Sequence, residues 1–355
     1  MSARISAAQL IAFATSLLTR AGLDADKAAT VAEILVEADL LGHTTHGLAL
    51  LAAYLAEIEQ GSMAKTGEPR VLADFPAAVT WDGHRLPGPW LTVRAFELAI
   101  ARARTQGTCT VVIRRSHHIA CLAAYLKRVT DQGLMALLTC SDPNVASVAP
   151  FGGRREVMTP NPVAAAWPTA GAPVILDVSM SITTNAMTNR LRAEKKSFPG
   201  PWAIDAGGEP TTDPNALFTK PPGTLLPAGG IDHGHKGYAL GLLVEALTGG
   251  LAGHGRADPK EGWGASVFVQ VLSPALFGGE NDFRRQTENL SQLCRENPPR
   301  AGFERVRLPG ENGLRQRAEG LAQGVELHPM ILPALASWAD KLGVTAPAAV
   351  SSRNQ

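Results

Sequence analysis

Short apolar runs alternate with helical patterns through the middle of the chain, and this alternation limits the possible folds more than any other feature. The runs predict strands over residues 77–81, 109–113, 134–140, 162–167, 174–178 and 264–272. The helical patterns predict helices over residues 91–106, 121–132 and 236–251. Strands that alternate with helices are typical of an α/β sheet. Residues 190–233 are rich in Pro and Gly and predict a long loop, which is usually functional in a compact domain.

Both ends of the chain predict helices. Near the N-terminus, expected helices run from Ser6 to near Gly22, from Asp24 or Asp26 onward, and from after Gly47 to Gly61. Toward the C-terminus, expected helices cover residues 283–296, 311–323 and 329–342. We expect these last helices to return to the N-terminal ones. The predicted domains are therefore a helical domain of residues 1–74, joined by residues 300–355, and an α/β domain of residues 75–299.

Composition excludes several classes of partner. The formal net charge of +1 argues against an electrostatic nucleic-acid binder. No apolar run approaches the roughly 18 residues that a membrane span needs. The four cysteines have no close paired spacing, and three of them lie in apolar runs, which predicts reduced thiols. We therefore expect a cytoplasmic protein that binds neither nucleic acid nor a membrane.

Two histidines, His43 and His46, lie three residues apart at a predicted junction between helices. A side chain at such a junction can face a cleft, and imidazole is well suited to move a proton near neutral pH. Two other interpretations stay open, namely a surface turn with incidental histidines and a His-x-x-His metal pair. No acidic residue lies between the two histidines, so the zincin pattern is absent.

Polar side chains also follow two predicted strands, at positions where sites form in α/β sheets. His117 and His118 come just after the strand that ends at Ile113, and Asp177 lies near the end of the strand over 174–178. A carboxylate at such a rim can orient an imidazole and stabilise its protonated form. The alternatives are histidines that only pack and an aspartate that only caps a helix.

Lys236 lies at the start of the predicted helix 236–251. Its charge adds to the free backbone N–H groups there and predicts an anion site, although a solvated lysine is the alternative. No Gly-x-Gly-x-x-Gly follows any predicted strand, so these residues alone do not suggest a nicotinamide cofactor.

In order and spacing, these motifs resemble the type-2 malate/L-lactate dehydrogenase family. That family includes sulfolactate and ureidoglycolate dehydrogenases, 2,3-diketogulonate reductase and piperideine-2-carboxylate reductase. The resemblance is carried by Asp39, Gly42, Thr45-His46-Gly47, Tyr54 and Gly61, by Ser116 to Ala120, by Asp177 to Ser181, by His235 to Tyr238, and by Pro309-Gly310-Glu311. Two positions depart from the family pattern, because Thr45 replaces a Ser and Leu50 replaces an Arg.

The resemblance implies an α/β fold with a non-Rossmann mixed-sheet cofactor domain, a separate helical domain built from both chain ends, and a homodimer. It implies catalytic roles for His46, His118, Asp177 and Thr45, with Asp177 paired to His46. It implies cofactor contacts from Ser141, Asp177, Val178, Ser179, His235, Lys236, Gly310 and Glu311. The family Arg is a partner for a substrate carboxylate, so Leu50 leaves that role to another cation such as Arg114, Arg115 or Arg190.

The function implied by the resemblance is an NAD(P)-dependent oxidoreductase that transfers a hydride between nicotinamide, as NAD or NADP, and a small 2-oxo or 2-hydroxy acid. A reductase of a cyclic imine carboxylate is an alternative within the family. A metal-dependent hydrolase or lyase with His43, His46, His117 and His118 as ligands is the alternative from another enzyme class. A relative that binds cofactor without activity is the third.

Overall fold

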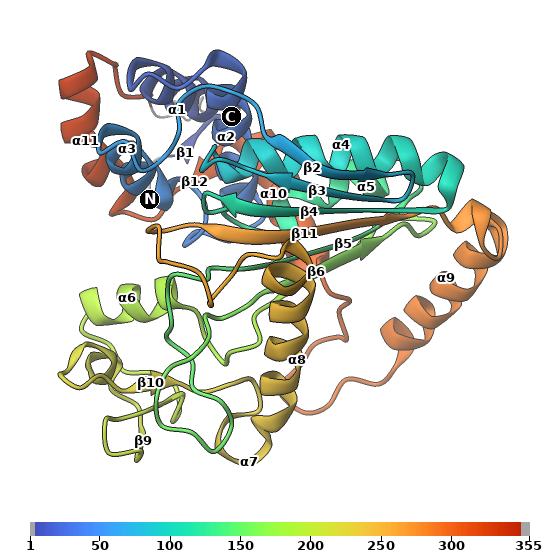
Figure 1. Ribbon diagram of the computed structural model, residues 1–355. Helices are drawn as coiled ribbons and strands as arrows, with labels where there is room; N and C mark the ends of the chain where they lie inside the picture. The colour runs from blue at the N-terminus through green and yellow to red at the C-terminus, as the bar shows by residue number, and fades with distance from the viewer. Residues whose placement is uncertain (1–3, 349–355) are drawn as a thin grey trace, which may run out of the picture.

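The computed structural model describes residues 4–348, and a seven-stranded mixed sheet crosses its centre (Figure 1). The strands lie in the order β2-β3-β4-β11-β5-β6-β7. β3 and β4 are parallel, and the other neighbours in this sheet are antiparallel. Their bounds are β2 (Arg70–Phe75), β3 (Ala78–Asp82), β4 (Thr108–Ser116), β5 (Met135–Ser141), β6 (Val163–Trp167), β7 (Val174–Val178) and β11 (Ala265–Leu272). A Rossmann sheet is mostly parallel, so the predicted non-Rossmann α/β class is confirmed.

The central strands β4, β5 and β11 are largely apolar, as expected for a sheet with helices on both faces. Figure 1 shows α4 (Gly88–Gln106) along one face and α8 (His235–Glu245) on the opposite side. Val111 and Ile113 of β4 are buried in the main core, to which α4 contributes. Val112, between them, packs on the other face with Phe268 of β11. The alternation of side chains along β4 therefore serves two cores.

Both ends of the chain supply helices to one helical unit beside the sheet (Figure 1). Ser6 caps the first helix as predicted, since its hydroxyl accepts a hydrogen bond from the Gln9 N–H. A short pair of strands, β1 (Arg4–Ile5) with β12 (Val325–Glu326), also joins the two ends. The helices of this unit are α1 (Ala7–Arg20), α2 (Ala25–Leu40), α3 (Leu51–Glu59), α10 (Glu311–Gln323) and α11 (Ile331–Leu342). The division into two domains at the predicted bounds stays a prediction.

Two predicted helices differ in the structure. Residues 121–132 form only a 3-10 turn, Ala123–Tyr125, and a short α5 (Lys127–Thr130). The predicted helix is broken because the Ala123 N–H bonds to a carboxylate on β7 and the Tyr125 hydroxyl bonds back to the Ile119 carbonyl. The helix α9 (Glu280–Glu296) does not return to the N-terminal helices, and Figure 1 shows it standing off the opposite end of the sheet. Its apolar residues Leu290 and Leu293 are exposed and do not pack on the N-terminal helices.

The predicted long loop of residues 190–233 holds small elements of its own. They include a three-stranded sheet of β8 (Ala203–Ile204), β9 (Pro210–Thr211) and β10 (Thr224–Leu225). The helices α6 (Asn185–Ala193) and α7 (Gly230–His233) lie at its two ends. Among the described residues, no helix combines the length and the apolar character that crossing a membrane requires.

Candidate active site

The turn between α2 and the 3-10 helix Leu48–Leu50 carries the first histidine pair. Asp39, near the end of α2, is buried, and its Oδ2 accepts a hydrogen bond from the Leu48 N–H at 2.8 Å. Gly47 lies so close that a Cβ there would come within 2.4 Å of the Asp39 carboxyl carbon. Asp39 and Gly47 therefore fix the path of the turn, and with it the position of His46.

Burial raises the pKa of Asp39 to about 7 from its usual 3.8, although the charge of Arg190 opposes the rise. An acid with a higher pKa in the folded state makes the folded protein less stable as the pH rises from about 4 to 7. We therefore expect Asp39→Asn to raise the melting temperature, by a few degrees more at pH 8 than at pH 5. Calorimetry at both pH values measures this difference. A change of the same size and sign at both would contradict the raised pKa.

His118, at the end of β4, is held by three neighbours. The Tyr54 hydroxyl on α3 lies 2.8 Å from Nδ1 of His118 and 3.2 Å from its carbonyl oxygen. The Ala120 N–H donates to the same Nδ1 at 3.3 Å, and the Trp263 ring stacks on the imidazole at 4.6 Å between centroids. Because Nδ1 accepts the Ala120 N–H, the proton of the neutral ring lies on Nε2. Nε2 of His118 is therefore a hydrogen-bond donor.

His46 faces His118 with 6.2 Å between the ring centroids. The Thr45 hydroxyl lies 2.8 Å from Nδ1 of His46. Burial lowers the pKa of both imidazoles, and that of His118 falls well below its usual value. At His46 the charge of Asp177 opposes this shift. Both rings are therefore neutral near pH 7, and His46 is the one that a nearby carboxylate helps to protonate.

Asp177, in β7, completes the group of four predicted catalytic residues. Its Oδ2 accepts hydrogen bonds from the Ala123 N–H at 2.8 Å and from the Cys121 thiol at 3.6 Å. Its charge raises the pKa of His46, but among residues 4–348 the two side chains share no direct hydrogen bond. Asp177 therefore lies close enough to His46 for its charge to act on the pKa of the imidazole, without a hydrogen bond between them. A role for this pair in catalysis stays a prediction.

The histidines do not converge as one metal ligand set. His117 is buried, and its Nε2 lies 3.2 Å from Glu57 Oε2. The described residues bring together one other possible set, His43, Cys121 and Asp177, whose ligand atoms lie within 4.8 Å of one another. Burial raises the pKa of the Cys121 thiol well above its usual value, and the thiol donates its proton to Asp177. In the metal-free protein this thiol is therefore protonated, and it would have to lose that proton to bind a metal ion.

The start of α10 lies against β7, the strand that carries several predicted cofactor residues. The Ile175 N–H donates to the carbonyl oxygen of the residue before Gly310 at 3.1 Å, and a Cβ on Gly310 would lie 2.9 Å from the Ile175 oxygen. Only glycine fits this close approach, at a φ of 90°. Val178 is 54% exposed beyond it. The structure thus places the start of α10, with Gly310 and Glu311, against the first half of β7, while Asp177, Val178 and Ser179 lie at the other end of this strand.

The start of α8 reaches the chain that follows β7. A Cβ on Gly237 would lie 2.5 Å from the Met180 carbonyl oxygen, so the helix begins in contact with this segment. Lys236 and His235 are exposed there, and the His235 ring lies edge-on to Phe151 at 5.6 Å.

Ser141 lies in a different setting from the other predicted cofactor residues. It is buried at the end of β5, where its hydroxyl donates to Glu245 at 2.8 Å and accepts from Arg256 at 3.1 Å. Glu245 and Arg256 border a cavity of about 630 Å³ between α8 and residues 249–258. A cofactor contact by Ser141 stays a prediction.

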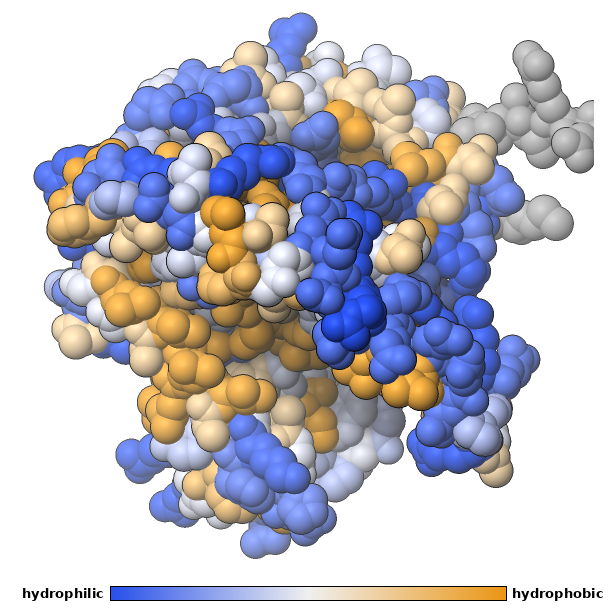
Figure 2. Space-filling model, turned by 90° about the vertical axis from the view of Figure 1, so that its right-hand side faces the viewer, coloured by the Kyte–Doolittle hydropathy of each residue, from blue (hydrophilic) through white to orange (hydrophobic). Residues whose placement is uncertain are grey.

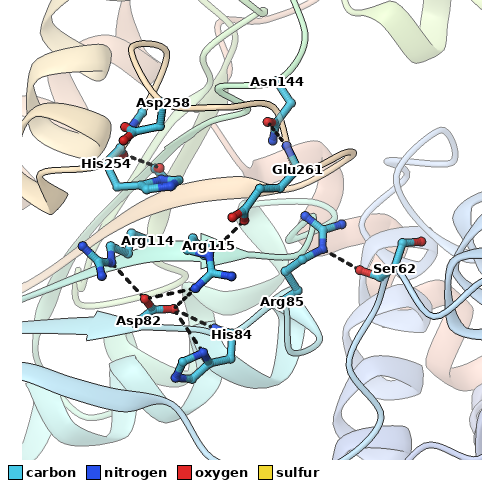
Figure 3. Close-up of polar contacts among 12 residues, drawn as sticks. Ser62, Asp82, His84, Arg85, Arg114, Arg115, Asn144, His254, Asp258 and Glu261 are labelled. Carbon is cyan, nitrogen blue, oxygen red and sulfur yellow. Dashed lines mark hydrogen bonds and ion pairs between the residues drawn. The ribbon is translucent and has the colours of Figure 1, made fainter.

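Two of the three arginines proposed to replace the charge missing at Leu50 are engaged elsewhere. Figure 3 shows Arg114 and Arg115 turned toward the buried Asp82, with Arg115 also bonded to Glu261. Arg190 of α6 instead reaches the histidine turn, where its guanidinium donates to the side chain and the carbonyl oxygen of Thr44.

Two features of the site were not predicted from the sequence, namely the stacking of Trp263 and the contact between Glu57 and His117. Trp263 stacks on His118, and Arg85 holds the Trp263 carbonyl oxygen at 3.0 Å. A signal for Trp263 was its place between two glycines just before an apolar strand. The Glu57–His117 contact carried no signal, because it joins residues 60 apart on different elements.

Comparison with known proteins identifies the family. A family model described as malate/L-lactate dehydrogenase matches residues 5–336. An L-lactate dehydrogenase of Cupriavidus necator is 33% identical over 98% of this chain and 100% of its own length. The structure of a malate dehydrogenase from Pyrococcus horikoshii OT3 aligns with a TM-score of 0.87 at 27% identity over 97% of each chain. That of a delta1-piperideine-2-carboxylate reductase from Pseudomonas syringae pvar. tomato aligns with a TM-score of 0.82 at 29% identity, over 95% of this chain and 99% of its own. The chain belongs to the malate/L-lactate dehydrogenase family.

Proposed function

We propose that this protein is an NAD(P)-dependent oxidoreductase that transfers a hydride between nicotinamide and a small 2-oxo or 2-hydroxy acid. The observation that carries the proposal is the pair of facing imidazoles, His46 and His118, 6.2 Å apart beside Asp177. One ring presents an N–H donor and the other has a carboxylate near enough to favour its protonated form. When a carbonyl is reduced, negative charge develops on its oxygen. A hydrogen bond stabilises this charge, and a proton completes the hydroxyl group.

Residues of β7 and of the starts of α8 and α10 support the binding of a nicotinamide nucleotide. Val178 offers exposed apolar surface, and the N-terminus of the 13-residue helix α10 offers backbone N–H groups. Lys236 adds a cation near the chain that follows β7. We propose that these elements hold the cofactor, as NAD or NADP, which when bound supplies or accepts the hydride.

The imidazoles would handle the substrate oxygen. In the direction of reduction, the Nε2–H of His118 donates a hydrogen bond to the carbonyl oxygen, and protonated His46 gives that oxygen its proton. Thr45 holds Nδ1 of His46, which leaves Nε2 for the transfer. The Asp177 charge favours the protonated His46 that reduction requires.

A cyclic imine carboxylate is the second substrate class. It is supported by the similarity to the piperideine-2-carboxylate reductase structure. The same His46 proton would go to an imine nitrogen in place of an oxygen. A panel that contains both 2-oxo acids and cyclic imines therefore separates the two classes.

A fluorescence titration of the purified protein with NADH and with NADPH tests the proposal. We expect saturable binding of at least one of them, followed by its oxidation when a 2-oxo acid or a cyclic imine is added. No binding of either at millimolar concentration would remove the dehydrogenase proposal. Loss of activity on chelation, with recovery on adding zinc, would favour the metal-dependent alternative instead.

We also propose that the protein is a homodimer. Three leucines of α8 are about half exposed, Leu240, Leu242 and Leu243, as are Leu290 and Leu293 of α9. Figure 2 shows apolar residues gathered in a broad band on the face that it presents. Contiguous exposed apolar surface marks interaction sites. Light scattering should give twice the chain mass of 37.4 kDa, and a mass of one chain would reject the dimer.

A cytoplasmic location is proposed as well. Cys109, Cys121 and Cys140 are free and buried, which suits a reducing compartment.

A further inference from the structure

Arg190 carries the cation that reaches the histidine turn from α6. Its Nη1 donates to the Thr44 hydroxyl and its Nη2 to the Thr44 carbonyl oxygen, both at 2.8 Å. Thr44 is two residues before His46, and the Arg190 charge lowers the pKa of that imidazole. The guanidinium is therefore fixed in place beside the group that handles the proton.

This guanidinium has no ion-pair partner within 4.0 Å among the described residues. Asp39 and Glu194 act on it only through longer-range charge, while partial burial lowers its pKa. A half-buried cation without a paired anion is unfavourable unless an anion joins it. Thr44 occupies two of the five N–H donors of the guanidinium, and the rest stay available for a planar acceptor.

The other arginines near this part of the sheet are already neutralised or committed. Asp82 lies 3.0 Å from Arg114 and 3.4 Å from Arg115 (Figure 3). The guanidinium of Arg85 donates hydrogen bonds to the carbonyl oxygens of Ser62 and Trp263. Leu50, in the 3-10 helix after the histidine turn, brings no charge. Arg190 is thus the guanidinium that the structure leaves for a substrate.

We propose that Arg190 binds the carboxylate of the substrate and so selects for 2-oxo and 2-hydroxy acids over their uncharged analogues. The inference rests on the proposed function, and it identifies the substrate group that α6 recognises. The pre-set fork on Thr44 holds the guanidinium rigid, so less side-chain freedom is lost when the carboxylate binds.

A comparison of charged and uncharged substrates tests this role. The probe is the 2-oxo acid that the wild-type protein reduces fastest in a panel with pyruvate, oxaloacetate and phenylpyruvate, together with its methyl ester. We expect Arg190→Leu to lower kcat/KM for the acid about 100-fold, mainly through KM, and to change that for the ester less than about threefold. Arg190→Lys should fall between, because it keeps the charge without the fork.

Arg192→Leu is the matched control. Arg192 lies on the same helix, is exposed, and contacts Asn215 and the Phe218 ring. We expect this variant to treat acid and ester as the wild type does. The melting temperature of each variant shows whether the protein remains folded when the contact between Arg190 and the histidine turn is lost.

Two results would overturn the inference. One is an equal loss for acid and ester in Arg190→Leu, which would make Arg190 only a support for the turn. The other is an equal effect of Arg190→Leu and Arg192→Leu on the acid, which would make the effect one of net charge. Either outcome leaves the proposed function standing, because that proposal is tested on the wild-type protein, by its binding and oxidation of NADH or NADPH.

Discussion

His46→Gln should lower kcat for reduction of a 2-oxo acid by about 1000-fold, within the range that general acid catalysis contributes. Glutamine keeps a polar side chain of similar length but cannot carry the proton. The Thr45 contact and the charge of the neighbouring Asp177 support the proposal that this imidazole transfers the proton. Binding of the reduced cofactor, measured by fluorescence, should change little because the predicted cofactor contacts lie on other elements, at β5, β7, α8 and α10.

The pH dependence of activity tests the same role of His46. Burial lowers the pKa of His46 from its usual value, so the fraction of protonated His46 falls as the pH rises through this lowered pKa. The wild-type kcat/KM for reduction should therefore decrease as the pH rises, and that for oxidation should increase to a plateau. In His46→Gln both slopes should disappear. The control is His84→Gln, which replaces a histidine that contacts Asp82 (Figure 3) and has no predicted role in proton transfer. This variant should keep the wild-type dependence of activity on pH.

His118→Gln should lower kcat by about 100-fold, the cost of removing one donor to a developing oxyanion. The reason is that His118 stays neutral and supplies its Nε2–H, while the proton itself comes from His46. The variant should therefore keep the wild-type slopes of activity against pH.

Two measurements define the limits of this prediction. Tyr54→Phe removes only the hydroxyl that lies 2.8 Å from Nδ1 of His118, so its activity should fall less than that of His118→Gln. If His118→Gln lost the pH dependence and His46→Gln kept it, the two histidines would have exchanged roles. The geometry of the pair would then need to be reinterpreted with His118 as the proton donor.

Local sequence patterns predicted most elements because their signals lie within one turn or one strand. The helix over 311–323 has the predicted bounds, with Gly310 before it, and the buried runs at 109–113 and 264–272 became the paired strands β4 and β11. The prediction of a helix over 121–132 was wrong because apolar spacing does not reveal the hydrogen bond that the Ala123 N–H donates to Asp177. The prediction that α9 returns to the N-terminal helices was also wrong, because the pattern of apolar residues in a helix does not specify which element it packs against.

The candidate site was predictable where one short motif carries it and hidden where distant segments meet. Thr45 and His46 are neighbours in sequence, and Asp177 ends an apolar strand, so each was visible locally. The contact of Arg190 with Thr44 joins residues 146 apart, and that of Tyr54 with His118 joins residues 64 apart. Such contacts depend on how the helical unit lies against the sheet, which no local pattern specifies.

Transfer of deuterium from a nicotinamide labelled at C4 tests the central claim most directly. The protein would be incubated with whichever reduced cofactor binds, deuterated at C4 in each of its two stereochemical forms, and with the 2-oxo acid that it consumes fastest. We predict that one of the two forms gives a 2-hydroxy acid about 1 Da heavier, labelled at the former carbonyl carbon. A product that carries no label from either form would contradict hydride transfer by this protein.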